Sequence, residues 1–178
     1  MSYEVKSSEV VYKGKVFNIE KDVITLPDGR EATRETVKHG GAAAMIPIDD
    51  EGKIIFVRQY RHSAGKEVLE IPAGTIEKGE DPYDCAVREI EEETSYKAGK
   101  MTFMFKMFSA IGFCSEIIYI YLAEDLIKGE FHMDADEFIT IERYSLDESI
   151  VLIEKGEICD SKTIAAILAY KNHIQQKQ

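Results

Sequence analysis

Acidic residues crowd one short stretch of this chain, where REIEEE runs from Arg88 to Glu93. On an α-helix, spacings of three and four bring side chains onto one face, so Glu89, Glu92 and Glu93 would project together. Arg88 can pair with Glu92 four residues later, but one guanidinium cannot neutralise three carboxylates. The run is either an ordinary solvated face or a site for hard divalent cations such as Mg²⁺ or Mn²⁺, which choose oxygen ligands and would offset the repulsion.

The helix that carries these carboxylates is predicted to begin at Asp81-Pro82, an acid followed by a proline suited to the first turn, and to extend to about Thr94. At 100° per residue, a stripe that would face the core forms on a separate arc of the same helix. Its members are Ala86, Val87, Ile90 and Thr94.

The segment from Gly74 to Tyr96, GTIEKGEDPYDCAVREIEEETSY, resembles the Nudix box. That motif is a glycine, five residues, a glutamate and seven residues, followed by R-E-apolar-x-E-E-x-G-apolar. The positions in register are Gly74, Glu80, Arg88, Glu89, Ile90, Glu92, Glu93 and Tyr96. Ser95 stands in place of the second glycine, and in a left-handed conformation serine would cost about 1 kcal/mol relative to glycine.

Other segments resemble the ADP-ribose pyrophosphatase branch of the Nudix hydrolases: GGAAAMIPID, VRQYR, EIPAG, GFCSE, ADEF and DSKT. The resemblance implies an α/β fold, specifically an α/β/α sandwich of mixed sheets with an N-terminal antiparallel strand region. That region, residues 1–39, would exchange contacts across a homodimer, and residues 40–178 would form the hydrolase domain. Ile111 departs from the branch, whose ADP-ribose enzymes tend to have a proline before this Gly-Phe.

Metal ligands follow from the resemblance. Glu89, Glu92 and Glu93, together with the backbone carbonyl of Ala73, are predicted to hold Mg²⁺, with Mn²⁺ as the alternative. Glycine at position 74 would let the loop come close to the helix and to the substrate.

The predicted catalytic residues are Arg88, Glu92 and Glu137. A base must take the proton of the attacking water, and the box glutamates are committed to metal. By resemblance, Glu137 is predicted to be the base. Asp134 and Asp136, on the same acidic loop before a strand, are rivals for this role. The alternative is that the loop is simply acidic and faces solvent.

The predicted substrate-binding residues are Arg34, Arg61 and Gly74. By resemblance the two arginines contact the nucleotide or its phosphates, Arg34 from the neighbouring subunit. Arginine suits this role because its planar fork binds phosphate through two bonds. Arg58 could serve equally, and for each arginine a surface salt bridge is the alternative.

The elements that must position these residues are mostly strands. Pro27-Asp28-Gly29 and Asp49-Asp50-Glu51-Gly52 predict turns of two hairpins. The strand Met101–Phe108 and the one containing Tyr119 and Tyr121 carry aromatics that are predicted to pack in the core. The predicted strands are 10–12, 16–26, 31–39, 42–48, 53–59, 67–72, 101–108 and 116–123, with later helices over 146–155, capped by Gly156, and from Asp160 or Ser161 onward.

The composition of the chain indicates which classes of binding partner are favoured. The 178 residues carry a formal charge of -11, which disfavours nucleic acid and anionic membrane surfaces. No apolar run approaches a membrane span, and the three distant cysteines are expected to be free thiols. We therefore expect a cytoplasmic protein with a small-molecule partner.

Together these features predict Mg²⁺-dependent hydrolysis of a nucleoside diphosphate sugar, ADP-ribose first, to AMP and ribose 5-phosphate. Two alternatives stay open: hydrolysis of another diphosphate, such as a GDP-sugar or a dinucleotide, and a module of the same fold that senses the nucleotide without cleaving it.

Overall fold

The computed structural model describes residues 3–129 and 138–176 of the chain. They divide into two compact units: the residues up to Gly41 together with Met107–Ile117, and Ala42–Lys106 together with the residues from Ile118 onward. No helix in the described ranges is long and apolar enough to cross a membrane.

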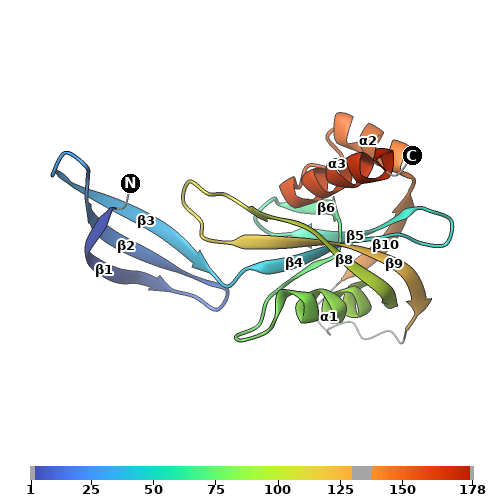
Figure 1. The fold of residues 1–178 in the computed structure, drawn as a ribbon, viewed down its shortest axis with the longest axis horizontal. Helices are drawn as coiled ribbons and strands as arrows, with labels where there is room; N and C mark the ends of the chain where they lie inside the picture. The colour runs from blue at the N-terminus through green and yellow to red at the C-terminus, as the bar shows by residue number, and fades with distance from the viewer. Residues whose placement is uncertain (1–2, 130–137, 177–178) are drawn as a thin grey trace. The chain divides into compact units, whose positions relative to one another are not determined.

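The first unit contains an antiparallel sheet in the order β1-β2-β3, formed by β1 (Glu4–Lys13), β2 (Phe17–Thr25) and β3 (Glu31–His39) (Figure 1). The predicted turn joins β2 to β3, since the Leu26 N–H donates to the Arg30 carbonyl at 2.8 Å. Residues 107–117 attach to this sheet, where the Val37 N–H donates to the Phe113 carbonyl at 2.7 Å. All of β1 is exposed in the single chain.

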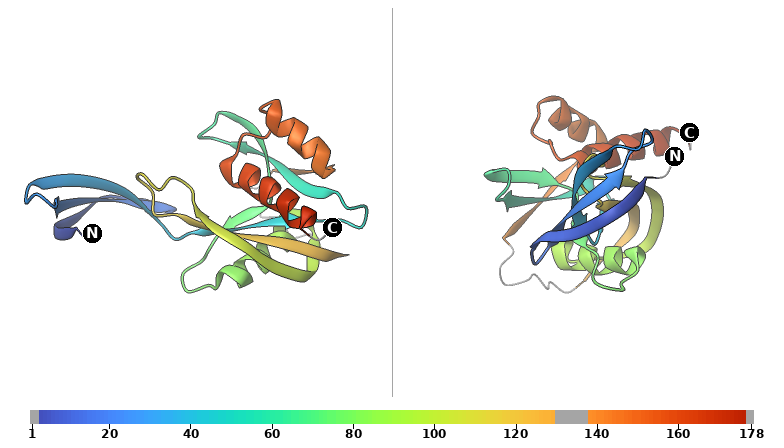
Figure 2. Two further views of the ribbon diagram at one scale, coloured as in Figure 1. Left: turned by 45° about the horizontal axis from the view of Figure 1, so that its top comes forward. Right: turned by 90° about the vertical axis from the view of Figure 1, so that its left-hand side faces the viewer.

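The second unit is an α/β/α sandwich. Its four-stranded sheet has the order β7-β4-β9-β8, and its three-stranded sheet has the order β10-β5-β6. One helix covers one side of the sheets and two helices cover the other (Figures 1 and 2). The elements are β4 (Ala42–Pro47), β5 (Ile54–Arg61), β6 (Lys66–Glu70), β7 (Ala73–Thr75), α1 (Pro82–Thr94), β8 (Tyr96–Phe108), β9 (Ile117–Lys128), β10 (Ile139–Tyr144), α2 (Leu146–Glu154) and α3 (Ser161–Gln175).

The core beneath α1 fixes that helix against the four-stranded sheet. Ala86 and Ile90 of α1 are fully buried with Met45 of β4, and Tyr121 of β9 joins the same cluster. Every residue of β4 is buried, since β9 (parallel) and β7 (antiparallel) pair with its two edges and α1 packs on one of its faces. Strand β4 therefore lies inside the core of this unit, directly beneath the helix that carries the glutamates.

The predicted stripe of α1 is wrong at one position. Val87 is 43% exposed, whereas Cys85 is fully buried and Glu93 is only 4% exposed. The helical period gives the width of the buried arc, but the sheet beneath decides its rotation.

Two further expectations fail on the strands. The turn at Asp49–Gly52 forms, yet β4 and β5 enter different sheets and share only the bridge between Ile48 and Ile54. Phe103 and Phe108 are 51% and 46% exposed rather than packed in the core, although Tyr121 is buried. Strand β7 was not predicted, because three residues are too few to show an alternating pattern.

Candidate metal and diphosphate site

Helix α1 begins and ends as its sequence indicates. Asp81 is the N-cap, its side chain accepting from the Tyr83 N–H at 2.8 Å, and Pro82 occupies the first turn. The helix ends at Ser95, whose φ of 62° is left-handed. The glutamates from Glu89 to Glu93 therefore all lie on one helix, whose two ends are set by local residues.

Arg88 organises the carboxylates of the helix. Its Nε donates to Glu80 at 3.0 Å, and its Nη1 donates to Glu89 at 2.6 Å and to Glu92 at 2.9 Å. Hydrogen bonding to Glu80, then to Glu89 and Glu92, raises the pKa of Arg88, while Arg88 lowers the pKa of Glu80. One guanidinium thus brings two of the predicted metal ligands together.

Strand β7 lies directly against the carboxylates of Glu89 and Glu93. A Cβ added at Gly74 would lie 1.8 Å from the carboxyl carbon of Glu89, so a larger residue could not occupy this position unless Glu89 moved. The neighbouring Ala73 N–H donates to Glu93 Oε2 at 3.0 Å. Two residues of one short strand therefore contact two glutamates of the helix.

The donor chemistry of this region suits a hard divalent cation. Glu89, Glu92 and Glu93 supply carboxylate oxygens, and Gly74 leaves the space into which the Glu89 carboxylate fits. Within residues 3–129 and 138–176, no three His, Cys, Asp or Glu side chains are already grouped as a metal site. Arg88 instead bridges Glu89 and Glu92.

Cys85 lies next to this face, but its thiol is expected to be unreactive. Burial, together with the charges of Glu80 and Glu89, raises the pKa of its thiol to about 12. The three cysteines are free, as predicted, and Cys85 is buried. A protonated thiol at neutral pH is a poor nucleophile, which leaves the chemistry of the site to the carboxylates.

Arg61 belongs to a second group of ion-paired side chains in the second unit, together with Glu70 and Lys162. Its Nε and Nη2 donate to the two oxygens of Glu70 at 2.8 Å each, and Glu70 also accepts from Lys162 Nζ at 2.6 Å. The hydrogen bond to Glu70 raises the pKa of Arg61, and the charges of Glu93 and Asp160 add to this shift. Burial would raise the pKa of Glu70, but Arg61 and Lys162 outweigh it and lower that pKa.

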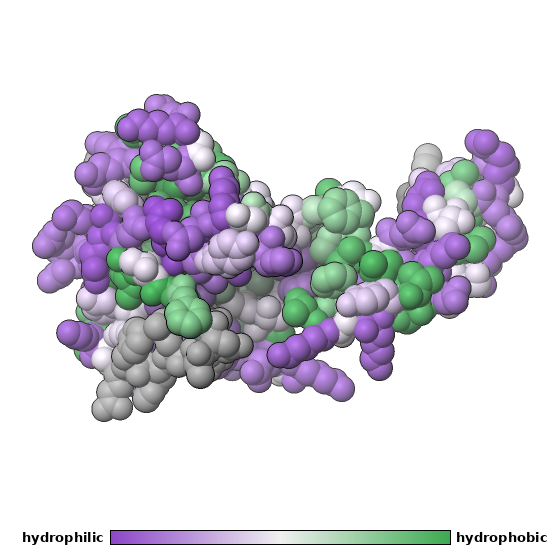
Figure 3. Space-filling view, turned by 180° about the vertical axis from the view of Figure 1, so that it is seen from behind, coloured by the Kyte–Doolittle hydropathy of each residue, from purple (hydrophilic) through white to green (hydrophobic). Residues whose placement is uncertain are grey.

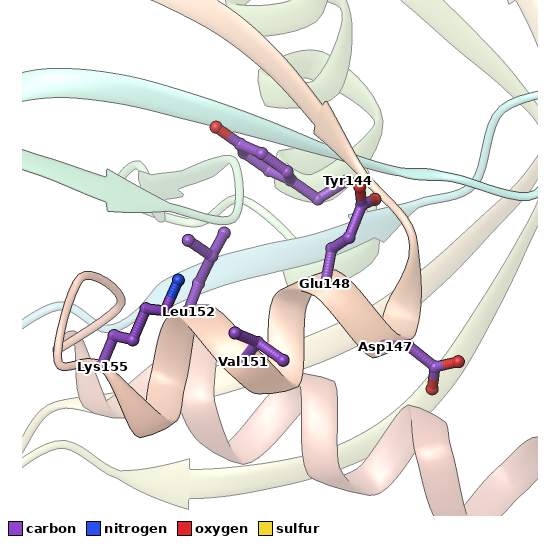
Figure 4. A pocket seen from close by; sticks show the side chains of 6 residues that line it. All are labelled: Tyr144, Asp147, Glu148, Val151, Leu152 and Lys155. Atoms are coloured by element: carbon purple, nitrogen blue, oxygen red, sulfur yellow. The ribbon is translucent and has the colours of Figure 1, made fainter.

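A cavity of about 410 Å³ opens beside this group. Its walls are Arg61, Ser63, Ala64, Val68, Glu70, Cys159, Asp160 and Lys162. A second cavity of about 350 Å³ lies between Tyr144 and the side chains of α2 (Figure 4), and no predicted site residue lines it.

The other predicted residues are not gathered here. Arg34 belongs to the first unit, where its Nη1 donates to the carbonyl of Thr33 at 2.9 Å. Arg58 pairs with Glu142 across β5 and β10, as the salt-bridge alternative predicts. Glu137, Asp134 and Asp136 lie outside the described residues, and Ile111 is 76% exposed.

Sequence reasoning missed Glu70 and Lys162. EIPAG and DSKT resemble segments of the family, but no local pattern in either one indicates that a charged residue is buried. The available signal was Asp160, which was predicted as a helix start and whose carboxylate holds Lys162 at 3.0 Å.

Comparison with known proteins is consistent across the chain. Residues 38–167 match the NUDIX domain family, and residues 3–37 match the nucleoside diphosphate sugar hydrolase N-terminal domain. The chain is 40% identical to ADP-ribose pyrophosphatase of Bacillus subtilis (strain 168), over 90% of this chain and 88% of that one. It is 42% identical to the methanol dehydrogenase activator of Bacillus methanolicus, with the same coverage of each.

A solved structure described as an ADP compounds hydrolase has the same fold. The TM-score is 0.88, with 99% of this chain and 96% of the other covered and 22% sequence identity.

Proposed function

The chain belongs to the NUDIX domain family, and from this premise we propose that it hydrolyses the diphosphate linkage of a nucleoside diphosphate sugar. ADP-ribose is the proposed first substrate, giving AMP and ribose 5-phosphate. The relative named ADP-ribose pyrophosphatase, 40% identical across most of both chains, supports this choice. The matching N-terminal domain of nucleoside diphosphate sugar hydrolases supports the substrate class.

The observation that carries the proposal is the contact between β7 and the glutamates of α1. The absent side chain of Gly74 makes room for Glu89, and the Ala73 N–H holds Glu93. On an acidic face that merely meets solvent the glutamates would extend into water, whereas here Glu93 is buried and the Glu89 carboxylate lies in the space that a side chain at position 74 would fill. These fixed positions support the proposal that the glutamates of α1 hold a ligand.

Glu89, Glu92, Glu93 and the carbonyl of Ala73 are proposed to hold the divalent ion that Nudix hydrolases use, Mg²⁺ here, with Mn²⁺ as an alternative. When bound, such an ion neutralises charge on the phosphate oxygens and lowers the pKa of a water molecule. Arg88 aligns Glu89 and Glu92 by donating to both. Arg61 is proposed to bind the diphosphate, and Glu137, with Asp134 and Asp136 as rivals, is the proposed base.

A substrate panel tests the activity. Purified protein with Mg²⁺ should release AMP from ADP-ribose faster than it cleaves a GDP-sugar or a dinucleotide. Preference for one of the other compounds would replace the substrate and leave the mechanism standing. Tight binding of ADP-ribose without turnover of any compound would favour the sensing module instead.

Replacing Glu93 by glutamine tests the enzyme most directly. Glu93→Gln removes one negative charge from the proposed metal site, and we expect turnover to fall by roughly a hundredfold or more while the fold is kept. Glu91→Gln is the matched control on the same helix, since Glu91 pairs with Lys97 at 3.1 Å and has no proposed role. Equal kcat in both variants would refute the metal assignment.

We also propose a cytoplasmic homodimer that assembles through the N-terminal strands. Val5, Val10, Val11 and Tyr12 of β1 are about half exposed in the single chain. Figure 3 shows hydrophobic surface among the polar atoms of this unit. Arg34 lies on the same sheet and is proposed to reach the substrate of the partner subunit.

A further inference from the structure

Helix α3 begins with polar side chains that are directed into the protein. The Asp160 carboxylate accepts from the Thr163 N–H at 3.0 Å and from the Thr163 hydroxyl at 2.6 Å. Lys162 donates to Glu70 at 2.6 Å and to Asp160 at 3.0 Å, and the residue is only 8% exposed. Burying an ammonium group carries a desolvation cost that a surface lysine avoids, so stability alone is a weak explanation of this placement.

This helix start holds the segment that forms one wall of the site. Glu70 binds Lys162, and the Ile71 N–H donates to the Thr163 hydroxyl at 3.0 Å. A few residues further on, Ala73 and Gly74 contact the glutamates of α1. Residues 70–74 are therefore fixed by α3 at one end and by α1 at the other.

Arg61 is the accessible end of the buried charge network. Its side chain is 39% exposed, against 4% for Glu70 and 10% for Lys162. The two bonds to Glu70 fix the plane of the guanidinium and leave most of its N–H donors for a ligand that enters the adjacent cavity. A phosphate that approached this group would meet Arg61 first.

We propose that Lys162 and Glu70 are positioning residues that hold Arg61 toward the diphosphate of the substrate. The inference rests on the proposed function and extends it to residues outside the Nudix box. Glu70 orients the guanidinium. Lys162 shares the charge of Glu70, so that the positive charge of Arg61 is not fully cancelled before a phosphate binds.

The test compares Lys162→Met, Arg61→Gln and the double variant with ADP-ribose as the probe. Lys162→Met and Arg61→Gln should each raise KM about tenfold, the effect of losing about one charge-assisted contact, while kcat changes by less than about threefold. The double variant should show no larger KM than Arg61→Gln alone, because Lys162 acts through Arg61. Independent, multiplying effects on KM would overturn the proposal.

A matched control and a second variant separate positioning from folding. Lys100→Met removes an equally short 2.6 Å bond to Glu124, but from an exposed pair, and should leave KM unchanged. Glu70→Met/Lys162→Met removes both buried charges and so leaves neither unpaired. If this folded variant keeps the wild-type KM, the positioning role is wrong even if Lys162→Met alone is unstable.

Failure of the two proposals can be told apart. Wild-type turnover with an unchanged KM in folded Lys162→Met overturns the positioning role and leaves the hydrolase intact. A wild-type protein that neither binds nor cleaves any compound of the panel overturns the proposed function, and the positioning role with it.

Discussion

At the scale of single residues, the proposed site depends on the missing side chain of Gly74 as well as on the glutamates of α1. Gly74 has no side chain, and this absence gives Glu89 its position against β7. Glu93 is buried, yet its carboxylate is held by a backbone N–H rather than left facing apolar atoms. Both features follow from the packing of one strand on one helix.

Gly74→Ala should disable the site while leaving the fold largely intact. The added Cβ would displace Glu89, and misplacing a reactive group by about 1 Å can cost on the order of a hundredfold in rate. We expect kcat to fall by about that factor, measured as AMP release from ADP-ribose. Circular dichroism should show the same secondary structure as the wild-type protein.

Gly129→Ala serves as the control for this substitution. There the added Cβ would lie 3.2 Å from Oε1 of Glu91, 3.4 Å from the carbonyl oxygen of Ser95 and 3.6 Å from Cε of Lys97, so Glu91 has to move only slightly and no proposed metal ligand is displaced. Activity should stay within about twofold of wild type, a change too small to require displacement of a reactive group. If Gly74→Ala is as active as Gly129→Ala, the close approach of β7 is unimportant for catalysis.

At the scale of elements, the end of α1 carries a cost. Ser95 adopts a φ of 62°, and its hydroxyl is buried without a hydrogen-bond partner among the described residues. Both features disfavour serine relative to the glycine found in the Nudix motif. Helix α1 therefore ends at the position expected from the motif, but with a less stable C-cap than glycine would give.

Ser95→Gly should stabilise the protein. Relief of the left-handed conformation is worth about 1 kcal/mol, which corresponds to a rise in Tm of about 2–4 °C for a chain of this size. Differential scanning calorimetry measures this change. Lys155→Gly at the end of α2 is the contrasting control, because Lys155 has a φ of -79° and glycine there only adds unfolded-state entropy. A lower Tm for Ser95→Gly would contradict the argument.

At the scale of the whole molecule, acid should unfold this protein partly through Glu70. Arg61 and Lys162 hold the pKa of Glu70 below its ordinary value of 4.5. A lowered pKa stabilises the fold at pH values above the unfolded pKa, and this contribution is lost as pH falls through the folded pKa. The free energy of unfolding should therefore drop as the pH decreases below about 5.

Glu70→Gln should weaken that dependence. Urea unfolding at pH 7 and at about pH 4 should show a smaller loss for Glu70→Gln than for wild type, because glutamine does not titrate. Glu124→Gln, at the exposed pair with Lys100, is the control and should keep the wild-type dependence. If the free energy of unfolding fell equally with pH in all three proteins, Glu70 would not contribute to the acid sensitivity.

Assembly is the second property of the whole molecule. Strand β1 lies at an edge of its sheet, and a long exposed edge with apolar residues favours pairing with another chain. Val11→Glu places a charge on this surface and should weaken self-association at least about tenfold, measured by sedimentation velocity. Ser7→Glu, at an exposed polar position of the same strand, should weaken it less. A wild-type monomer at micromolar concentration would refute the dimer.

Much of the local structure could be read from the sequence. Both ends of α1, and with them the helical position of its glutamates, were predicted, because a helical period, a cap and a proline act within a few residues of one another. The same holds for the turns at Pro27–Gly29 and Asp49–Gly52, which are set by local backbone preferences. The Nudix box is a local motif, so the sequence by itself determined the family and the type of chemistry.

Only the tertiary structure decided how these pieces meet. It separated β4 and β5 into two sheets, turned Val87 outward and buried Glu93. It also joined Lys162 to Glu70 across 92 residues of sequence. Contacts between distant segments have no local period, and whether a charge is buried depends on what the rest of the fold places over it.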